Sequence, residues 1–348
     1  MAALINSTIA SDLMSCTFCA YFSYTQRQVL AAIWFLMSFV GVTGNSLVII
    51  AILSSPKLQR VTNYFVFNLS VADLLTSLFI PFTAVAVLNE TEWPLPMVLC
   101  SITAFILLTC LGCSINNLAC IAVNRFVLIT KKQETYRRLF SKRRTILAIL
   151  ITWLIPLFTT VVPTSIGYIQ LGFEPKYSSC SWVLAQSSNG FVLILFATFC
   201  PIQLSVIIYC YIRVFTHIRQ HAKKVEPSLG TKTETVSTVL DTVSSTTTRP
   251  KPPDIASSST AKEPKPKRSR LQVQVTINLF LVVCAFILCV VPYAVTLLVP
   301  RSRQVFPFAA TLFMGNSCLN PIIYAFKHPQ FKTVFRCILT GKFSEIPK

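Results

Sequence analysis

The stretch Met97–Phe126, "MVLCSITAFILLTCLGCSINNLACIAVNRF", decides the fold. It carries no charged side chain before Arg125, and it is longer than the roughly 20 residues that cross a bilayer as a helix. Because a fixed charge in apolar surroundings is costly, Arg125 must lie where it finds water or exchangeable partners. The stretch therefore predicts a membrane-spanning helix, and taken alone it favours an arginine that extends to the interface over a functional one.

Six further runs of the same kind lie along the chain, and only the second contains a charge, Asp73. The runs are Val29–Pro56, Val61–Asn89, Thr145–Phe173, Tyr177–Ile212, Leu271–Pro300 and Gln304–Phe326. None alternates over about 10 residues as a barrel strand would. Of the 348 residues, 53% are hydrophobic and only 12% are charged, which is typical of membrane proteins. We expect an all-α membrane protein, a seven-transmembrane helix bundle.

The net charge is +19. The positions of the basic residues along the chain indicate membrane topology and not nucleic-acid binding. Seven spans place the connecting segments alternately on two sides of the membrane. Of the 31 lysines and arginines, 27 fall on the side opposite the N-terminus. The positive-inside rule makes that side cytoplasmic. We expect a multi-pass plasma-membrane protein with an extracellular N-terminus at residues 1–28.

The bundle, residues 29–326, is interrupted by a polar third intracellular loop at 221–270. Between Ser228 and Thr260 it has 16 Ser or Thr in 33 residues. Such a segment buries too little apolar surface to offset its ordering entropy, so we expect disorder. It is either a kinase substrate whose phosphates recruit arrestin or a solvated spacer.

After the last span, residues 327–348 contain "KHPQFKTVFRCILTGK". Helical spacing places Phe331, Phe335, Ile338 and Leu339 on one face, which predicts a short amphipathic cytoplasmic helix (helix 8) lying on membrane lipid. Cys337 is a candidate for palmitoylation, and an unmodified thiol is the alternative.

Two extracellular sequons, at Asn6 and Asn89, predict glycosylation. Cys100 and Cys180 both face the oxidising side, which favours a disulfide between them. Cys16 and Cys19 either pair or remain free, and the sequence leaves that open.

Polar residues inside the spans form a pattern around the lone carboxylate, Asp73. Intramembrane polar groups are functional candidates by default. Hydroxyl and amide oxygens at similar depth come from Ser114, Asn316, Ser317 and Asn320. Together they suit a small hard cation, and sodium is the expected ion. The alternative is a purely structural hydrogen-bond network with Asp73 protonated.

These residues, in this order, resemble the rhodopsin-like (class A) G-protein-coupled receptors, nearest the branch of amine, melatonin, adenosine and opsin receptors. The resemblance runs from span 1 to the amphipathic helix and rests on an ordered set of motifs. The set is "GN..V" at Gly44–Val48, "NLSVADL" at Asn68–Leu74, Cys100, Arg125, Trp153, Cys180, Pro201, Tyr209, "F..C..P" at Phe286–Pro292 and "NPIIY" at Asn320–Tyr324.

The resemblance implies a role for Arg125 in the cavity that accepts a G protein. Tyr209 and Tyr324 would turn inward to stabilise the opened state, and Pro201, Ile115 and Phe286 would repack as span 6 swings out. Binding of a ligand would shift the population between the two packings.

The chain departs from the family at three positions. Asn124 stands where an acid usually precedes the arginine, which predicts weaker restraint and raised basal signalling. Phe126 replaces a tyrosine. Val290 replaces the usual tryptophan two residues before Pro292, so the link from ligand to core must run differently.

The resemblance also implies a ligand pocket, carried over by spacing. Its residues would be Leu107, Leu108, Leu111, Leu193, Ala197, Tyr293, Leu297, Phe306, Ala310 and Met314. Leu107 stands where amine receptors have an aspartate, and Met314 where opsins have the retinal lysine, so neither a cationic amine nor retinal is expected. The apolar lining favours a neutral or lipid-like small molecule, with a peptide as the alternative.

The sequence therefore predicts a receptor that binds an extracellular ligand and activates heterotrimeric G proteins, with arrestin and receptor kinases as further partners. A decoy or arrestin-biased receptor without G-protein coupling is the alternative. No HExxH motif or nucleophile–base pair indicates an enzyme, and no internal repeat indicates a transporter.

Overall fold

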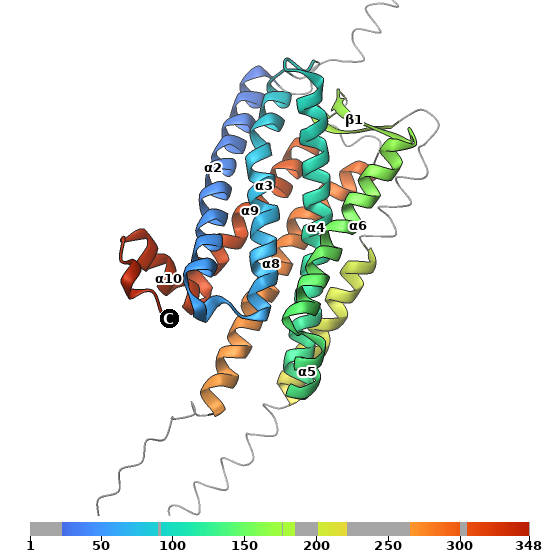
Figure 1. The fold of residues 1–348 in the computed structure, drawn as a ribbon. Coiled ribbons are helices and arrows are strands. Elements are labelled where there is room, and N and C mark those ends of the chain that lie inside the picture. Colours follow the sequence, from blue (N-terminus) through green and yellow to red (C-terminus); the bar gives the residue numbers. More distant parts are fainter. Residues whose placement is uncertain are drawn as a thin grey trace, which may run out of the picture.

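The computed structural model describes residues 23–89, 92–175, 177–184, 201–220, 265–299 and 305–347, except for the side chains of 184, 265–279, 297, 298 and 329. Long helices run side by side as one bundle, with a hairpin at one end and a short helix beside the other (Figure 1). Several predictions concern residues outside the described ranges or side chains: Asn6, Cys16, Cys19, Leu193, Ala197, Leu297 and the Ser/Thr-rich loop up to residue 264.

The first three long helices are α2 (Tyr24–Ser54), α3 (Val61–Asn89) and α4 (Met97–Thr130). A capping box starts α2: Gln26 donates its backbone N–H to Ser23 Oγ, and Ser23 donates its own to Gln26 Oε1. The 3-10 turn η1 (Pro56–Leu58) leads the chain from α2 into α3.

The remaining elements follow in chain order. They are α5 (Gln133–Leu139), α6 (Lys142–Ser165), β1 (Ile169–Glu174), β2 (Ser179–Leu184), the helix Pro201–Gln220, α8 (Lys265–Leu298), α9 (Phe306–Lys327), α10 (Pro329–Leu339) and η2 (Phe343–Glu345). Helix α8 begins inside the segment predicted to be a disordered loop up to residue 270.

Five of the described helices are long and apolar enough to cross a membrane: α2, α3, α4, α6 and Pro201–Gln220. In α8 the described side chains include a shorter apolar stretch, Phe280–Thr296. Helix α9 completes the bundle, and Asn316, Ser317 and Asn320 are polar residues within its otherwise apolar sequence.

The two charge-free runs Thr145–Phe173 and Tyr177–Ile212 are only partly helical, and the strands that lie in them were not predicted from the sequence. Helix α6 ends at Ser165, and Gly167 follows with φ 76°, a left-handed conformation that favours glycine. Strands β1 and β2 then pair antiparallel, with Phe173 opposite Cys180. Both runs lack charge because the hairpin covers the bundle end, so absence of charge did not separate strand from helix.

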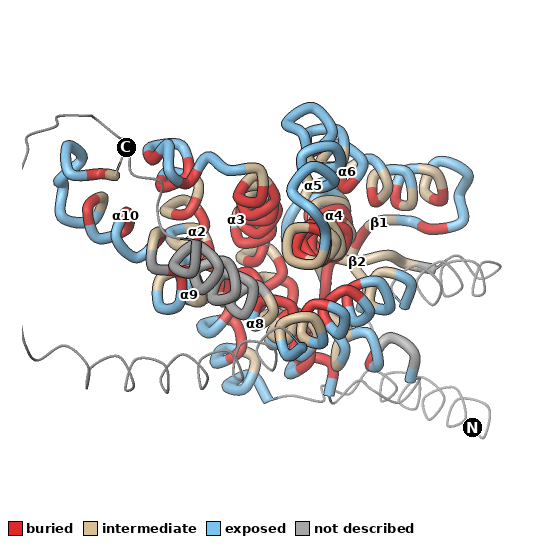
Figure 2. Tube along the Cα trace, turned by 90° about the horizontal axis from the view of Figure 1, so that it is seen from below, coloured by how far each residue is buried: buried red, intermediate tan, exposed pale blue. Residues whose placement is uncertain are grey.

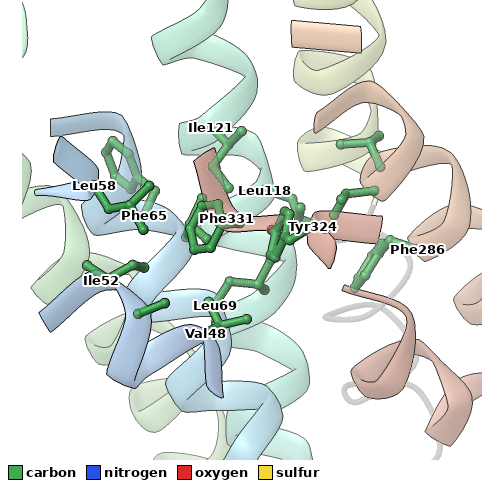
Figure 3. Packing of buried hydrophobic residues seen from close by; sticks show 14 of the residues in the cluster. Val48, Ile52, Leu58, Phe65, Leu69, Leu118, Ile121, Phe286, Tyr324 and Phe331 are labelled. Carbon is green, nitrogen blue, oxygen red and sulfur yellow. The ribbon is translucent and has the colours of Figure 1, made fainter. Parts of the chain in front are cut away.

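The largest apolar cluster lies in the half of the bundle near α10. Phe65, Leu118, Phe286 and Tyr324 are buried there together (Figure 3). Phe331 of α10 stacks on Tyr324 with ring centroids 5.5 Å apart, which fixes α10 to the bundle. Seen along the bundle in Figure 2, the buried residues of the long helices face one another and the exposed ones face outward, as expected for helices surrounded by lipid.

Glycine allows α2 and α3 to approach closely. A Cβ at Gly41 would lie 2.1 Å from Ser77 Oγ and 2.9 Å from Ser77 Cβ, so Gly41→Ala would force the helices apart. Overpacking of this kind costs about 1–3 kcal/mol. We expect a lower thermal unfolding midpoint for Gly41→Ala in the purified receptor.

Gly315→Ala is the matched control for Gly41→Ala, because the nearest atom to its added Cβ is Met37 Cε at 3.5 Å, an ordinary contact. Alanine is also the better helix former. The midpoint of this control should stay or rise. Equal losses in both variants would contradict close packing at Gly41.

Helix α10 is amphipathic, as predicted, although its buried face differs from the predicted one. Phe331, Val334 and Phe335 are buried, whereas Leu339 is 74% exposed. Cys337 is also buried, and its sulfur donates to the Glu345 carbonyl oxygen at 3.8 Å. The segment after α10 folds back over Cys337, so in this conformation its thiol is not open to palmitoylation.

Candidate functional site

Asp73 lies buried on α3 and is bonded from α9. Nδ2 of Asn320 donates to Asp73 Oδ2 at 2.6 Å, and Ser317 forms a second hydrogen bond with the carboxylate. Ser114 and Asn316 are buried as well, on α4 and α9. The side-chain oxygens Oδ1 of Asn316 and Oδ1 of Asn320 have no hydrogen-bond partner. Two buried amide oxygens without a partner and one carboxylate are acceptors of the kind that a small hard cation takes, although Asn320 turns its Nδ2 toward Asp73.

Arg125 is only 3% exposed, near the end of α4. Its Nε has no hydrogen-bond partner, and among the described residues no acid forms an ion pair with it. Three tyrosines lie near enough to act on it electrostatically, Tyr211, Tyr136 and Tyr324. The hydroxyls of Tyr211 and Tyr324 are buried without partners. The arginine is therefore surrounded by phenol groups and not by carboxylates.

The side chain of Asn124 forms its hydrogen bonds with residues other than Arg125. The Thr62 hydroxyl donates to its Oδ1 at 3.1 Å, and its Nδ2 donates to the Tyr136 hydroxyl oxygen at 3.3 Å. Tyr136 stacks on Phe140, with centroids 5.5 Å apart. The amide thus ties α4 to α3 and α5, a neutral connection where the family usually has a charge.

The helix Pro201–Gln220 turns one stripe of residues toward the bundle in this conformation. Its buried face consists of Ile207, Cys210, Tyr211 and Val214, a helical i, i+3, i+4, i+7 stripe. Tyr209 is 58% exposed, although its ring contacts that of Phe126 at 6.2 Å between centroids.

Tyr211, and not Tyr209, is therefore the inward tyrosine of this conformation. Pro201 is exposed as well, whereas Ile115 and Phe286 are buried in the largest cluster. Pro292 is half-buried within α8.

A cavity of about 120 Å³ lies in the half of the bundle covered by the hairpin. Seven residues that the resemblance placed in the pocket line it: Leu107, Leu108, Leu111, Tyr293, Phe306, Ala310 and Met314. Val290 lies on its wall too. Two hydroxyl oxygens on the lining, Thr83 Oγ1 and Ser179 Oγ, are buried without a hydrogen-bond partner. The cavity is apolar with a few free polar groups.

The hairpin closes the cavity from outside. Ile169, Ser181 and Trp182 contribute to the lining, and Tyr177 at the hairpin turn stacks on Phe306, with centroids 4.3 Å apart. The aromatic contacts continue from Phe306 to Tyr293 at 5.4 Å and on to Phe313 at 4.7 Å. A continuous ladder of rings joins the hairpin to α9 and α8.

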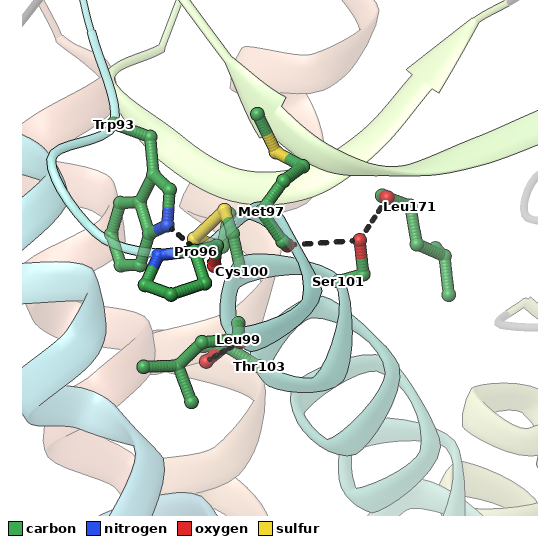
Figure 4. The surroundings of a disulfide bond; sticks show 9 residues. Trp93, Pro96, Met97, Leu99, Cys100, Ser101, Thr103 and Leu171 are labelled. Carbon is green, nitrogen blue, oxygen red and sulfur yellow. Dashed lines mark hydrogen bonds between the residues drawn. A yellow bond between two sulfur atoms is a disulfide. The ribbon is translucent and has the colours of Figure 1, made fainter.

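The predicted disulfide between Cys100 and Cys180 is confirmed and attaches the hairpin to the first turn of α4. Figure 4 shows its surroundings: Ser101 Oγ donates to the Leu171 carbonyl oxygen at 2.6 Å, and Trp93 Nε1 donates to the Pro96 carbonyl oxygen at 3.1 Å. Nearby, Asn89 ends α3 with an exposed side chain, as a glycosylation site requires.

His328 joins α9 to α10 and is buried. Burial, together with the positive charges of Arg125 and Arg60, lowers the pKa of its imidazole to about 4. At neutral pH the ring is therefore uncharged, and it packs edge-on against Phe331 at 4.9 Å. This neutral ring adds no positive charge near Arg125.

One cluster was not identified from the sequence. Asn68 Nδ2 donates to Asn117 Oδ1 at 3.0 Å and to Thr152 Oγ1 at 3.2 Å, while Trp153 Nε1 donates to Asn68 Oδ1 at 2.8 Å. Asn117 Nδ2 continues to the Phe65 carbonyl oxygen at 2.8 Å. The network joins α3, α4 and α6. The available signal in the sequence was that two amides, Asn68 and Asn117, and one indole, Trp153, lie at similar depth in three predicted spans.

Known proteins resemble this chain along most of its length. The model of the 7 transmembrane receptor (rhodopsin family) matches residues 44–324. The alpha-1A adrenergic receptor of Oryzias latipes is 26% identical over 348 residues, covering 95% of this chain and 72% of that protein. The melatonin receptor type 1B-B of Danio rerio is 27% identical over 325 residues, covering 90% and 82%.

The fold is also that of a solved structure. The crystal structure of squid rhodopsin superimposes with a TM-score of 0.70 at 18% identity, covering 94% of this chain and 89% of that one. The predicted seven-transmembrane bundle is thereby confirmed, and the matched family consists of receptors and not of enzymes. The chain is a multi-pass membrane protein that belongs to the rhodopsin family of class A G-protein-coupled receptors.

Proposed function

We propose that this receptor activates heterotrimeric G proteins when an extracellular ligand binds. The observation that carries the proposal is the buried Arg125, which has no acidic partner among the described residues and lies beside Tyr211 and Tyr324 from two other helices. Such an arginine can exchange partners when the helices separate. The change of packing then makes Arg125 available to a bound G protein.

The test is nucleotide exchange by purified G proteins of several classes on the receptor in nanodiscs. Exchange on any member, lost in Arg125→Ala, supports the proposal. Arrestin recruitment without exchange on any member supports the alternative, a decoy or arrestin-biased receptor, which the unusual Asn124 favours. Deleting Ser228–Thr260 and measuring arrestin recruitment tests whether this loop is the target of receptor kinases.

For the ligand we propose a compact, neutral and largely apolar molecule with one or two hydrogen-bonding groups. The cavity of about 120 Å³ is below the 300–1,000 Å³ usual for drug-sized ligands, and Leu107 supplies no counter-ion for a cation. The free hydroxyls of Thr83 and Ser179 are the expected partners of the polar groups. Testing neutral lipophilic compounds and cationic amines on the receptor in the exchange assay shows which class activates it.

We further propose that sodium binds beside Asp73 and favours the inactive packing. The free oxygens of Asn316 and Asn320 support this site, although no group of three His, Cys, Asp or Glu gathers among the described residues. Raising NaCl should reduce basal nucleotide exchange in the wild type about two- to tenfold relative to choline chloride of the same ionic strength. Asp73→Asn should abolish the difference between the salts, and a difference that persists would contradict the site.

The distribution of lysine and arginine supports an orientation with the N-terminus outside and α10 in the cytoplasm. An epitope at the N-terminus should be stained on intact cells, and one at the C-terminus only after permeabilisation. Staining of both on intact cells would overturn the orientation.

A further inference from the structure

A groove of about 520 Å³ lies on the outer surface of the bundle where α2, α9 and α10 meet. In Figure 1, α10 lies beside the lower ends of α2 and α9. A Cβ at Gly44 would come within 2.8 Å of Pro321 Cβ, so α2 and α9 touch and close the groove at its floor. Leu47, Ala325 and Phe335 line the apolar walls. The groove is therefore a long apolar slot that opens toward the surroundings of the bundle.

The rim of the groove is positively charged. Lys332 and Arg336, one helical turn apart on α10, both line it and are exposed. Neither forms an ion pair with an acid in the part of the chain that the structure describes, whereas Lys342 just beyond α10 pairs with Glu345 at 3.2 Å. Two adjacent cations, one of them a guanidinium with fixed donor geometry, match a phosphate group.

The surroundings of the groove are hydrocarbon. Phe326 and Leu339, at its edge, are 75% and 74% exposed, as expected where side chains contact acyl chains. The buried side of α10, Phe331 and Phe335, faces the bundle. The groove thus offers an apolar slot on the membrane side and two cations at the level of the headgroups.

We propose that this groove binds one anionic glycerophospholipid of the leaflet beside α10, the cytoplasmic leaflet in the orientation proposed above. An acyl chain lies along Leu47 and Ala325, and the phosphate is held by Lys332 and Arg336. A zwitterionic lipid carries its own cation next to the phosphate and gains less from the two side chains. The proposal does not depend on G-protein coupling.

The experiment counts lipids bound to the full-length receptor in detergent, by native mass spectrometry after adding phosphatidylserine or phosphatidylcholine. The wild type should retain one phosphatidylserine in preference to phosphatidylcholine. Each basic residue near an anionic surface contributes a similar free energy of binding. Removing two of them in Lys332→Gln/Arg336→Gln should therefore weaken phosphatidylserine binding by roughly 30-fold. Equal retention of the two lipids by the wild type would overturn the proposal.

Two comparisons separate a built site from general surface charge. Lys142→Gln/Arg143→Gln removes the same charge from exposed positions at the start of α6 and should retain phosphatidylserine like the wild type. Ala325→Leu keeps both cations, fills the slot and should lose the bound lipid. Equal loss in the α6 variant, or full retention in Ala325→Leu, would show that the lipid is held by charge alone and would refute the groove. Thermal midpoints of all variants check that each is folded.

Discussion

Asn124→Asp is expected to lower ligand-free G-protein activation by this receptor about five- to thirtyfold. The substitution places a carboxylate next to Arg125, which otherwise has no acidic partner in the described structure. A buried charge pair gains Coulomb energy but loses hydration, and we take its net contribution to the closed packing as about 1–2 kcal/mol. That free energy shifts the balance between closed and open packings by the stated factor.

The structure indicates that the variant will fold. An aspartate at 124 still accepts from the Thr62 hydroxyl, and the Tyr136 hydroxyl can turn to donate to it, so both contacts of Asn124 survive. The measurement is basal nucleotide exchange per receptor, with surface expression quantified in parallel.

Asn124→Ala is the control for this experiment. It removes the two hydrogen bonds that Asn124→Asp keeps and adds no charge, so basal exchange should stay or rise. A fall in Asn124→Ala equal to that in Asn124→Asp would attribute the effect to lost packing and not to the ion pair. No fall in Asn124→Asp would mean that Arg125 is already restrained by its phenol neighbours.

The sequence predicted the bundle because lipid imposes a simple requirement. Each span must be apolar and hydrogen-bonded within itself, so length and absence of charge identify it. At the hairpin the same criterion did not separate strand from helix, because both strands are uncharged apart from Glu174. Gly167 and the cysteine at 180 were the local signals that a helix had ended, yet the charge-free runs extended through both.

Which face of a helix turns inward in a given state was harder to predict than the helix itself. The resemblance placed Tyr209 inward only in the opened state, and in this conformation packing against α4 and α8 buries Tyr211, whose ring lies 5.1 Å from that of Phe280. The stripe Ile207, Cys210, Tyr211 and Val214 in the sequence contained this information, but neighbouring faces of a membrane helix are all apolar. Only contacts between helices decide which face turns inward.

Contacts between distant residues were hardest to anticipate. Asn68, Asn117 and Trp153 are ordinary residues of three separate runs, and only the crossing of α3, α4 and α6 brings them together. The same applies to Asn124, whose partners Thr62 and Tyr136 lie on other elements. Which buried polar groups pair depends on their depth in the membrane and on the register between neighbouring helices. A single sequence determines these only in part.

Asn68→Leu is expected to destabilise the receptor by about 2–4 kcal/mol. The substitution leaves the Trp153 indole N–H without its acceptor and removes the donor to Asn117 and Thr152. An unpaired buried polar group costs about 1–3 kcal/mol, while hydrogen bonds between membrane helices average only about 0.6 kcal/mol. Asn68→Leu breaks three such contacts, and a cost per contact between these two values gives the stated range.

The buried thiols of the chain make the loss measurable. Cys110, Cys113, Cys210, Cys289 and Cys318 are buried and free, so a thiol-reactive dye reports unfolding as the temperature rises. The midpoint of Asn68→Leu should fall by about 5–10 °C. Thr43→Val removes an exposed hydroxyl that bonds only within its own helix, and its midpoint should match the wild type. An unchanged midpoint for Asn68→Leu would mean that the crossing of α3, α4 and α6 is held by apolar packing, with the amide network contributing little.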